Sequence, residues 1–342
     1  MDTIHDTTGT LDEALQRLHT TGPEFDGWLS NHGPMAVESL VRGGQAPRVH
    51  RWLDQYSERL DAMPAPGDPI RADDWQGALG DPKRLADWIV FFERAVAERP
   101  WRDVLAEWWP WLLPGIAAGA THPVIRVGHA VRTLLAEPAG ANAPRLAELA
   151  HGLGYWAARH QPLPPLTALP SVPDAAVALD AVPRIEDQSG GIRARFTRLT
   201  AFPAWTEAGP VDPDAARERL GELVGAAVRM YGTHALGSPV MLVHAATAPN
   251  AVLRTLPALP RELWAESLDA AWAASAAVTS VYAPPTPAPA PVPSGAEPEE
   301  VFARAAAHGN DHAIKFADTA LEVGGDQALA AASLALDLIE PA

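Results

Sequence analysis

Apolar side chains recur at helical spacing along most of this chain, and this periodicity restricts the fold more than any other feature. Within 82–97, Leu85, Ile89 and Phe92 lie three or four residues apart, which places them on one face of a helix. The apolar content is mostly Ala and Leu, while β-branched residues are sparse, and this composition favours helix over sheet. The sequence therefore predicts an all-α fold.

Pro and Gly interrupt the pattern and set the expected ends of the helices. Helices are expected over 12–18, 35–41, 47–63, 82–97, 101–112, 115–135, 144–160, 214–231, 239–256, 261–281, 299–323 and 326–338. The region 174–213 has no clear period. Its weak alternation at 192–199 is not enough to predict a sheet.

A low-complexity, Pro-rich stretch at 283–298 could separate two domains, since such a sequence favours extended backbone. The residues that follow it provide only two expected helices, which are too few to close a core by themselves. We therefore expect residues 1–342 to form one large multi-helix domain with Pro-rich surface loops. In that arrangement, 283–298 is a surface crossover.

Composition excludes several classes of function. The net charge of −16 weighs against a nucleic-acid partner, because phosphate binding depends on clustered Lys and Arg. The absence of cysteine excludes disulfides, iron–sulfur clusters and Cys nucleophiles, so any metal must take nitrogen or oxygen ligands. The polar start, 1–10, does not look like a signal peptide, and no apolar run is long enough for a membrane span. We expect a cytoplasmic protein with no membrane partner.

The sharpest local motif is His308-Gly-Asn-Asp-His312-Ala-Ile-Lys315. Residues three and four apart share a helix face, so a continuous helix would point His308, His312 and Lys315 the same way. Gly309 and Asn310 are poor helix formers, however. A helix that begins at Asn310 or just after it would leave His308 outside.

Lys315 is unusual in its own right, because Lys83 is the only other lysine among 26 basic residues. A lysine can lose its proton, act as a nucleophile or be carboxylated by carbon dioxide, whereas arginine stays charged. The alternative is a lysine whose stem covers apolar surface while its amine reaches solvent. Spacing alone favours neither interpretation.

Further histidines occur in apolar helical contexts. His122 and His129 lie seven residues apart, His244 is followed by Thr247 one turn later, and His32 stands at an expected helix start. Each one alone is more often a satisfied core or surface residue than a ligand. Burying all of them without a shared partner would be costly, however, so as a group they indicate a metal site.

Other catalytic motifs are missing from the sequence. It has no phosphate-binding loop, dinucleotide fingerprint, Gly-x-Ser-x-Gly elbow or His-Glu-x-x-His motif. Helical phosphohydrolases use a His-Asp doublet, but the only one here is His5-Asp6 in the polar terminus. Trp108, Trp109 and Trp111 could line an aromatic pocket, although a packed core is their commoner use.

Four of these motifs, in this order, resemble the questin oxidase-like family. They are Asn31-His32-Gly-Pro-Met-Ala, Thr121-His122-Pro-Val-Ile-Arg126, His244-Ala-Ala-Thr247 and Asp311-His312-Ala-Ile-Lys315. The resemblance implies a helical fold that binds non-haem iron. The implied ligands are four histidines (His32, His122, His244 and His312) and a carboxylated lysine, Lys315. It also implies that Thr247 hydrogen-bonds the carbamate, with His129 and His308 as substitutes if one ligand is misassigned.

The family includes fungal enzymes that oxidise and open anthraquinone-type polyketides, as well as many bacterial members. The resemblance therefore implies an oxygenase of secondary metabolism that uses Fe²⁺ and O₂ on a small aromatic molecule, by Baeyer–Villiger-type oxygen insertion or ring cleavage. Mn or Zn would suit the same ligands, and NADPH is a candidate reductant. The sequence departs from the fungal pattern at Arg126, where a further His is common. A metal-dependent hydrolase and a non-catalytic metal- or ligand-binding helical protein are the alternatives.

Overall fold

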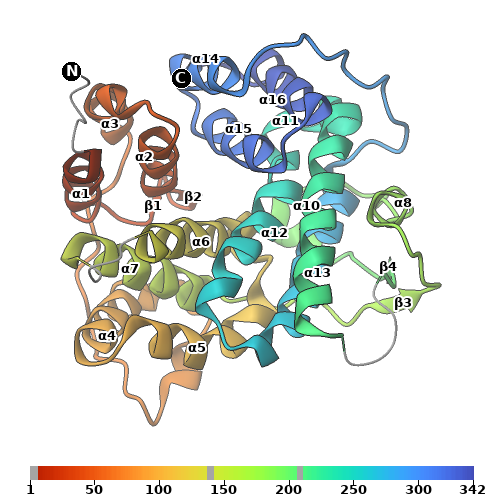
Figure 1. Ribbon diagram of the computed structural model, residues 1–342. Coiled ribbons are helices and arrows are strands. Elements are labelled where there is room, and N and C mark those ends of the chain that lie inside the picture. The colour runs from red at the N-terminus through yellow and green to blue at the C-terminus, as the bar shows by residue number, and fades with distance from the viewer. Residues whose placement is uncertain (1–6, 137–141, 206–210) are drawn as a thin grey trace.

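The computed structural model describes residues 7–136, 142–205 and 211–342, and helices dominate it (Figure 1). The helices are α1 Thr7–Leu18, α2 Gly33–Arg42, α3 Val49–Ser57, α4 Leu85–Glu98, α5 Trp101–Leu112, α6 His122–Leu135, α7 Ala143–Arg159, α8 Ala175–Asp180, α9 Ile192–Phe196, α10 Pro213–His234, α11 Pro239–Leu242, α12 His244–Thr255, α13 Trp264–Tyr282, α14 Pro298–His308, α15 Asp311–Val323 and α16 Asp326–Leu338. The predicted all-α class is confirmed. Across the described ranges, no helix combines the length and the hydropathy needed to cross a membrane.

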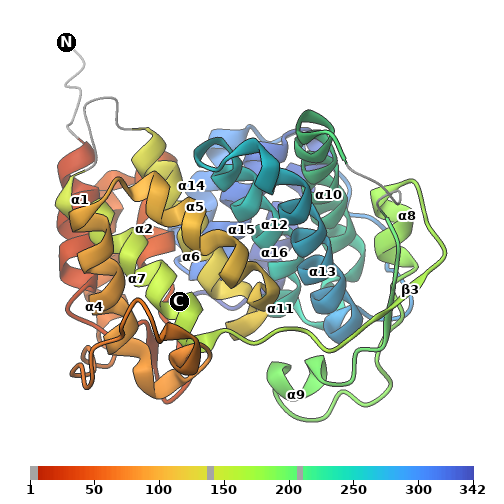
Figure 2. The same cartoon turned by 90° about the horizontal axis from the view of Figure 1, so that it is seen from below.

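Strands are short and peripheral to the helices. β1 Glu24–Phe25 and β2 Leu29–Ser30 form an antiparallel hairpin, with Phe25 opposite Leu29. β3 Thr167–Leu169 pairs in parallel with β4 Ala201–Pro203. Figure 2 shows β3, α8 and α9 on an outlying stretch of chain beside the helical body. The hairpin matters for function, because it leads directly into α2.

Helices α6 and α12 join the two halves of the fold (Figures 1 and 2). α6 also packs on α7, which packs on α4, while α12 also packs on α10 and α13. The contact between α6 and α12 is close at Gly128, where a Cβ atom would lie 2.6 Å from the Ala251 Cα atom. Only glycine fits there. The first residues of both helices, His122 and His244, are thereby held near each other.

The helices after the Pro-rich stretch pack on the rest of the chain. α15 contacts α2, α10 and α12, and α16 contacts α10. Residues 283–298 run between α13 and α14 mostly exposed, and Val292 is 87% exposed. Buried side chains from Leu11 to Ile339 belong to one continuous hydrophobic core.

Three of the expected helices are shorter in the structure than the sequence predicted. The helix expected over 115–135 begins only at His122, after 3₁₀ turns, because Gly119, Ala120 and Thr121 take left-handed backbone conformations. The helix expected over 299–323 breaks at Gly309, which has φ 80°, and Asn310 then caps α15. The helix expected over 47–63 ends at Ser57.

Candidate metal centre

The starts of four helices converge on one point inside the protein. His32 immediately precedes α2, His122 and His244 are the first residues of α6 and α12, and His312 is the second residue of α15. The ring of His122 lies 4.3 Å from that of His32 and 4.5 Å from that of His244, centroid to centroid. The rings of His32 and His312 are 4.5 Å apart. The structure thus brings together the four histidines that the family resemblance implied; their role as ligands remains a prediction.

Each of the four imidazoles is held through its Nδ1 atom by an oxygen. The Gly119 carbonyl lies 2.5 Å from His122, and the Met241 carbonyl lies 2.9 Å from His244. One oxygen of Asp311 lies 2.5 Å from His32 and 2.8 Å from His312. Because these oxygens accept hydrogen bonds, each Nδ1 carries the hydrogen, and each Nε2 keeps its lone pair for a cation.

The Nε2 atoms of His122 and His244 lie only 2.8 Å apart. In the tautomers set by the two carbonyls, neither Nε2 carries a hydrogen, so two lone pairs face each other. That arrangement is repulsive unless a cation is shared. Ligand nitrogens of His32, His122 and His312 also lie within 4.8 Å of one another, which suits a common metal ion.

Burial keeps these imidazoles neutral, which is the form that binds metals. Desolvation lowers the pKa of His32 to about 3 and lowers the pKa of His312. It holds the pKa values of His122 and His244 well below the usual range. Burial alone would raise the pKa of Asp311, but His32 and His312 outweigh it and hold that pKa well below the usual value.

Lys315 lies one turn after His312 on α15, and its side chain is buried. Desolvation lowers the pKa of its amine to about 8. The charge of an ammonium there contributes to lowering the pKa of all four imidazoles, after the larger effect of burial on each. Within the described part of the chain, Lys315 Nζ has no hydrogen-bond partner, and neither does the buried Thr247 Oγ1. Buried polar atoms usually have a partner, so this pair fits the binding of a further polar group.

A strained turn positions His122. Ala120 and Thr121 have φ values of 57° and 67°, which L-residues with side chains rarely adopt, and β-branched ones least of all. The carbonyl that orients the His122 ring belongs to Gly119 in the same turn. Strain of this kind persists where the surrounding structure enforces it, and it is common at functional sites.

A cavity of about 420 Å³ opens onto the histidines, a size typical of small-molecule sites. Its apolar walls come from Phe25, Trp28, Leu29, Ile192, Val240 and Met241, and its polar side includes His32, His122, His312, Tyr56 and Arg59. The Tyr56 hydroxyl accepts a hydrogen bond from the His32 backbone N–H at 2.7 Å. Burial raises the pKa of Tyr56 above its usual value, so the phenol keeps its proton and can donate it to a ligand.

Arg59 adds a positive charge to this cavity. Its guanidinium lies 4.5 Å from the centroid of the Tyr56 ring. Within the described residues it has no carboxylate partner. Arg59 is therefore available to attract an electron-rich oxygen of a ligand.

The two substitute histidines lie elsewhere. His308 Nε2 bonds to the Ile339 carbonyl at 3.0 Å, and His129 Nδ1 bonds to Glu38 at 2.7 Å.

The three tryptophans expected near a pocket do not line the cavity at the histidines. Trp108 and Trp109 are buried in the core and Trp111 is 54% exposed, whereas the indole that lines this cavity belongs to Trp28. The doublet His5-Asp6 lies outside the described residues.

Sequence reasoning missed several groups at the site, above all Asp311 and Trp28. Asp311 directly precedes His312 at a helix start, where a carboxylate orienting an imidazole was foreseeable. Trp28 comes just before the His32 motif, in a hairpin that was not anticipated.

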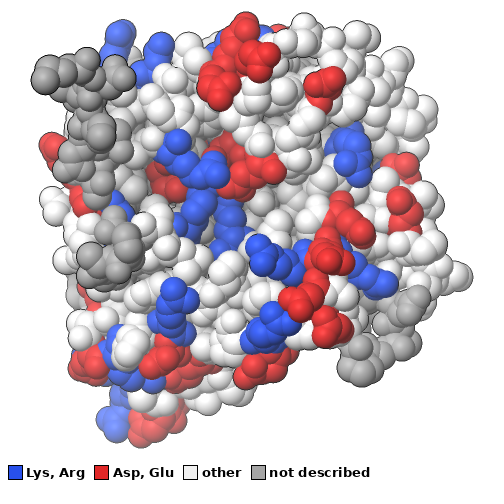
Figure 3. Space-filling view, in the orientation of Figure 1, with Lys and Arg blue, Asp and Glu red and all other residues white. Residues whose placement is uncertain are grey.

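A second polar cluster lies further along the same four helices. It consists of Glu38, His129, Arg132, Arg254, Asp318 and Glu322, and is called the ionic cluster below. Figure 3 shows acidic and basic side chains gathered in a hollow on this face. Ligand atoms of Glu38, His129 and Asp318 lie within 4.8 Å of one another. Arg132 and Arg254 donate to these carboxylates, however, and Arg42 pairs with Asp318 and Glu322, so three guanidiniums balance the three carboxylates without a metal.

Fold and site together define a helical protein with a buried histidine–lysine centre beside an apolar cavity. The family model described as questin oxidase-like matches residues 29–320, and the chain belongs to that family. The family indicates an oxidoreductase of the oxidase or oxygenase type. No curated protein matches the chain significantly.

Proposed function

We propose that this protein is a non-haem iron-dependent oxygenase that acts on an aromatic, polyketide-like substrate. The observation that carries the proposal is the pair of facing Nε2 atoms of His122 and His244, 2.8 Å apart, in two rings whose Nδ1 atoms each lie against a backbone carbonyl. A shared cation resolves this repulsion. The family supplies the oxidase class.

The chain offers a suitable set of ligands. His32, His122, His244 and His312 would hold the metal through Nε2, and Lys315 through a carbamate formed with carbon dioxide. The unpaired Thr247 hydroxyl would donate a hydrogen bond to that carbamate. Imidazole and oxygen ligands suit iron, and also Mn or Zn, and bound iron would activate dioxygen beside the cavity.

The cavity residues would bind and orient the substrate. Its apolar walls exclude water from a flat aromatic ring. The neutral Tyr56 phenol, which accepts from the His32 backbone, has its own proton free for a substrate carbonyl. Arg59 would stabilise a phenolate. These contacts suit oxygen insertion next to a ring carbonyl or ring opening, with NADPH as a candidate reductant.

The decisive test measures oxygen consumption by Fe²⁺-loaded protein with a hydroxyanthraquinone. We expect turnover in the wild type and none in Lys315→Arg, because a guanidinium cannot form a carbamate. Lys83→Arg, at an exposed position, is the matched control. Iron analysis should show that Lys315→Arg retains little metal. Full iron occupancy in that variant would refute the assignment of Lys315 as a ligand.

Two other results would favour the alternatives. Product formation without oxygen would indicate a metal-dependent hydrolase. Purified protein that gains no metal when Fe²⁺ is added would indicate a non-catalytic binding protein. Because a carbamate forms only from the neutral amine, iron loading should rise with bicarbonate and as the pH passes through about 8.

A further inference from the structure

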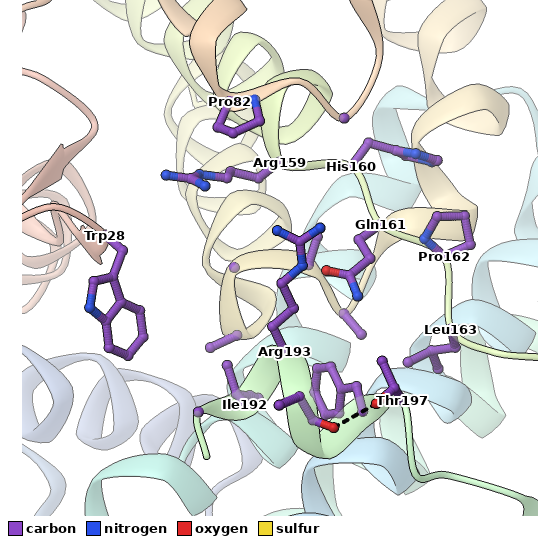
Figure 4. A pocket seen from close by; sticks show the side chains of 18 of the residues that line it. Trp28, Pro82, Arg159, His160, Gln161, Pro162, Leu163, Ile192, Arg193 and Thr197 are labelled. Atoms are coloured by element: carbon purple, nitrogen blue, oxygen red, sulfur yellow. Dashed lines mark hydrogen bonds between the residues drawn. The ribbon is translucent and has the colours of Figure 1, made fainter.

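A second cavity of about 700 Å³ adjoins the first (Figure 4). We refer to it as the outer chamber, and to the 420 Å³ cavity at the histidines as the inner chamber. Both chambers are lined by Trp28, Gly119, Ala120, Gly191 and Ile192. Because these five residues, called the shared wall below, line both cavities, the two chambers adjoin each other at this point.

The outer chamber carries a positive charge that nothing in the described residues neutralises. Arg159 also lines it, but Glu24 takes both of its hydrogen bonds. Arg193, on α9, has no hydrogen bond or salt bridge to any described residue. Figure 4 shows the side chains of Arg193 and Gln161 in this chamber. A free guanidinium, with an amide in the same chamber, is a suitable receptor for a carboxylate.

The shared wall suits the aromatic part of the same molecule. Trp28 is 62% exposed, which is unusual for an indole and leaves a flat face available to a ligand. Beyond it, the inner chamber is mostly apolar up to the histidines. Charge and polarity therefore change along one path, from Arg193 past Trp28 to the metal centre.

We propose that the substrate is an aromatic carboxylic acid whose ring occupies the inner chamber and whose carboxylate is bound by Arg193 in the outer chamber. This proposal rests on the proposed function and specifies its substrate class. Arg193 is then a specificity-determining residue, remote from the reacting ring. Its charge would select acidic substrates over neutral ones of the same ring system.

The test compares the binding of a dihydroxyanthraquinone with that of its monocarboxylic acid, by calorimetry on the iron-loaded full chain. We expect the wild type to bind the acid about ten-fold more tightly, as a charge-assisted hydrogen bond at a partly exposed site would give. Arg193→Gln should lose this preference while binding the neutral compound as before. Arg304→Gln, at an exposed position of α14 that lines neither chamber, should keep it.

Each outcome has a distinct meaning. Equal affinities in the wild type, or a preference that survives Arg193→Gln, would overturn the role of Arg193 and leave the proposed function standing. If neither compound binds, both proposals fail. In a competition experiment, a saturating concentration of the neutral compound should displace the acid. If it does not, the two chambers bind separate ligands, and the proposal that one substrate occupies both is wrong.

Discussion

The histidine centre and the ionic cluster share helices α2, α6, α12 and α15, but they differ in how their polar atoms are satisfied. In the ionic cluster, Asp318 accepts hydrogen bonds from Arg132 at 2.9 Å and from Arg254 at 2.6 Å. In the histidine centre, the amine of Lys315 has no partner among the described residues, although it lies only three positions before Asp318 on α15.

This difference shows how the fold can tolerate an unsatisfied site. The ionic cluster joins the four helices near the histidines: Glu38 comes from α2, Arg132 from α6, Arg254 from α12 and Asp318 from α15. The helix starts are therefore held in place even though facing imidazoles and a buried amine would tend to push them apart. The ionic cluster stabilises the fold and the metal-free histidine centre destabilises it, as is common for binding sites.

The largest expected effect comes from breaking the ionic cluster at Asp318. Asp318→Asn leaves the buried Arg132 and Arg254 guanidiniums without this carboxylate, which should cost about 3–5 kcal/mol of unfolding free energy. Urea unfolding measures the loss. Asp187→Asn, which removes an exposed partner of Arg198, should leave the midpoint unchanged. A small effect at Asp318 would mean that the cluster does not hold the helices together.

Acid should unfold the protein by protonating the buried carboxylates. Burial alone would raise the pKa of Glu38 and Glu148, but Arg132 and Arg126 outweigh it and hold both pKa values at about 2, compared with 4.5. A lowered folded-state pKa contributes stability above pH 4.5 that is lost as the pH falls toward 2. Unfolding free energy measured across this range should drop steeply. Glu148→Gln should be less stable at neutral pH and show a shallower drop.

At the histidine centre, substitution of a polar residue should raise the free energy of unfolding, whereas at the ionic cluster it should lower it. Lys315→Met keeps the unbranched apolar stem and removes an unpaired buried amine, so the free energy of unfolding of the metal-free protein should rise by about 1–3 kcal/mol. The folded-state pKa of about 8 lies below the unfolded value of 10.5, so the wild type loses stability as the pH falls from 10.5 to about 8, and the full penalty is present below pH 8. The gain should therefore shrink over that interval. A Lys315→Met variant that is less stable at pH 7 would show that the amine has a partner.

The comparison also shows what a sequence can reveal. Histidines in apolar helices indicated a metal site, because buried imidazoles need a shared partner, but the particular set of four came from the resemblance of their motifs to a known family. The segment of α15 was expected to be helical only as the second part of one helix over 299–323. The ionic cluster was not recognisable as a whole. The partners of Arg132, Glu38 and Asp318, lie 94 and 186 positions away from it, and no local sequence pattern links them.

The start of α6 could not be predicted for a local reason. Left-handed backbone is usually marked by glycine, yet here two of the three such residues are Ala120 and Thr121. Their conformation is imposed by tertiary contacts, which a reading of propensities does not capture. The turn that orients His122 thus became visible only in the folded chain.

A substitution in that turn should have the smallest effect on unfolding free energy, and it tests whether stability and metal binding change independently at the histidine centre. Ala120→Gly relieves a left-handed conformation, which is worth about 1–2 kcal/mol, but it adds about 0.4–1 kcal/mol of backbone entropy to the unfolded chain. Thermal unfolding should therefore show a net stabilisation of about 1 kcal/mol or less. Ala130→Gly, inside α6, should instead destabilise by about 1 kcal/mol. Because the Gly119 carbonyl would then hold His122 less firmly, Ala120→Gly should weaken metal binding while stabilising the fold, whereas the Asp318 substitution should weaken both.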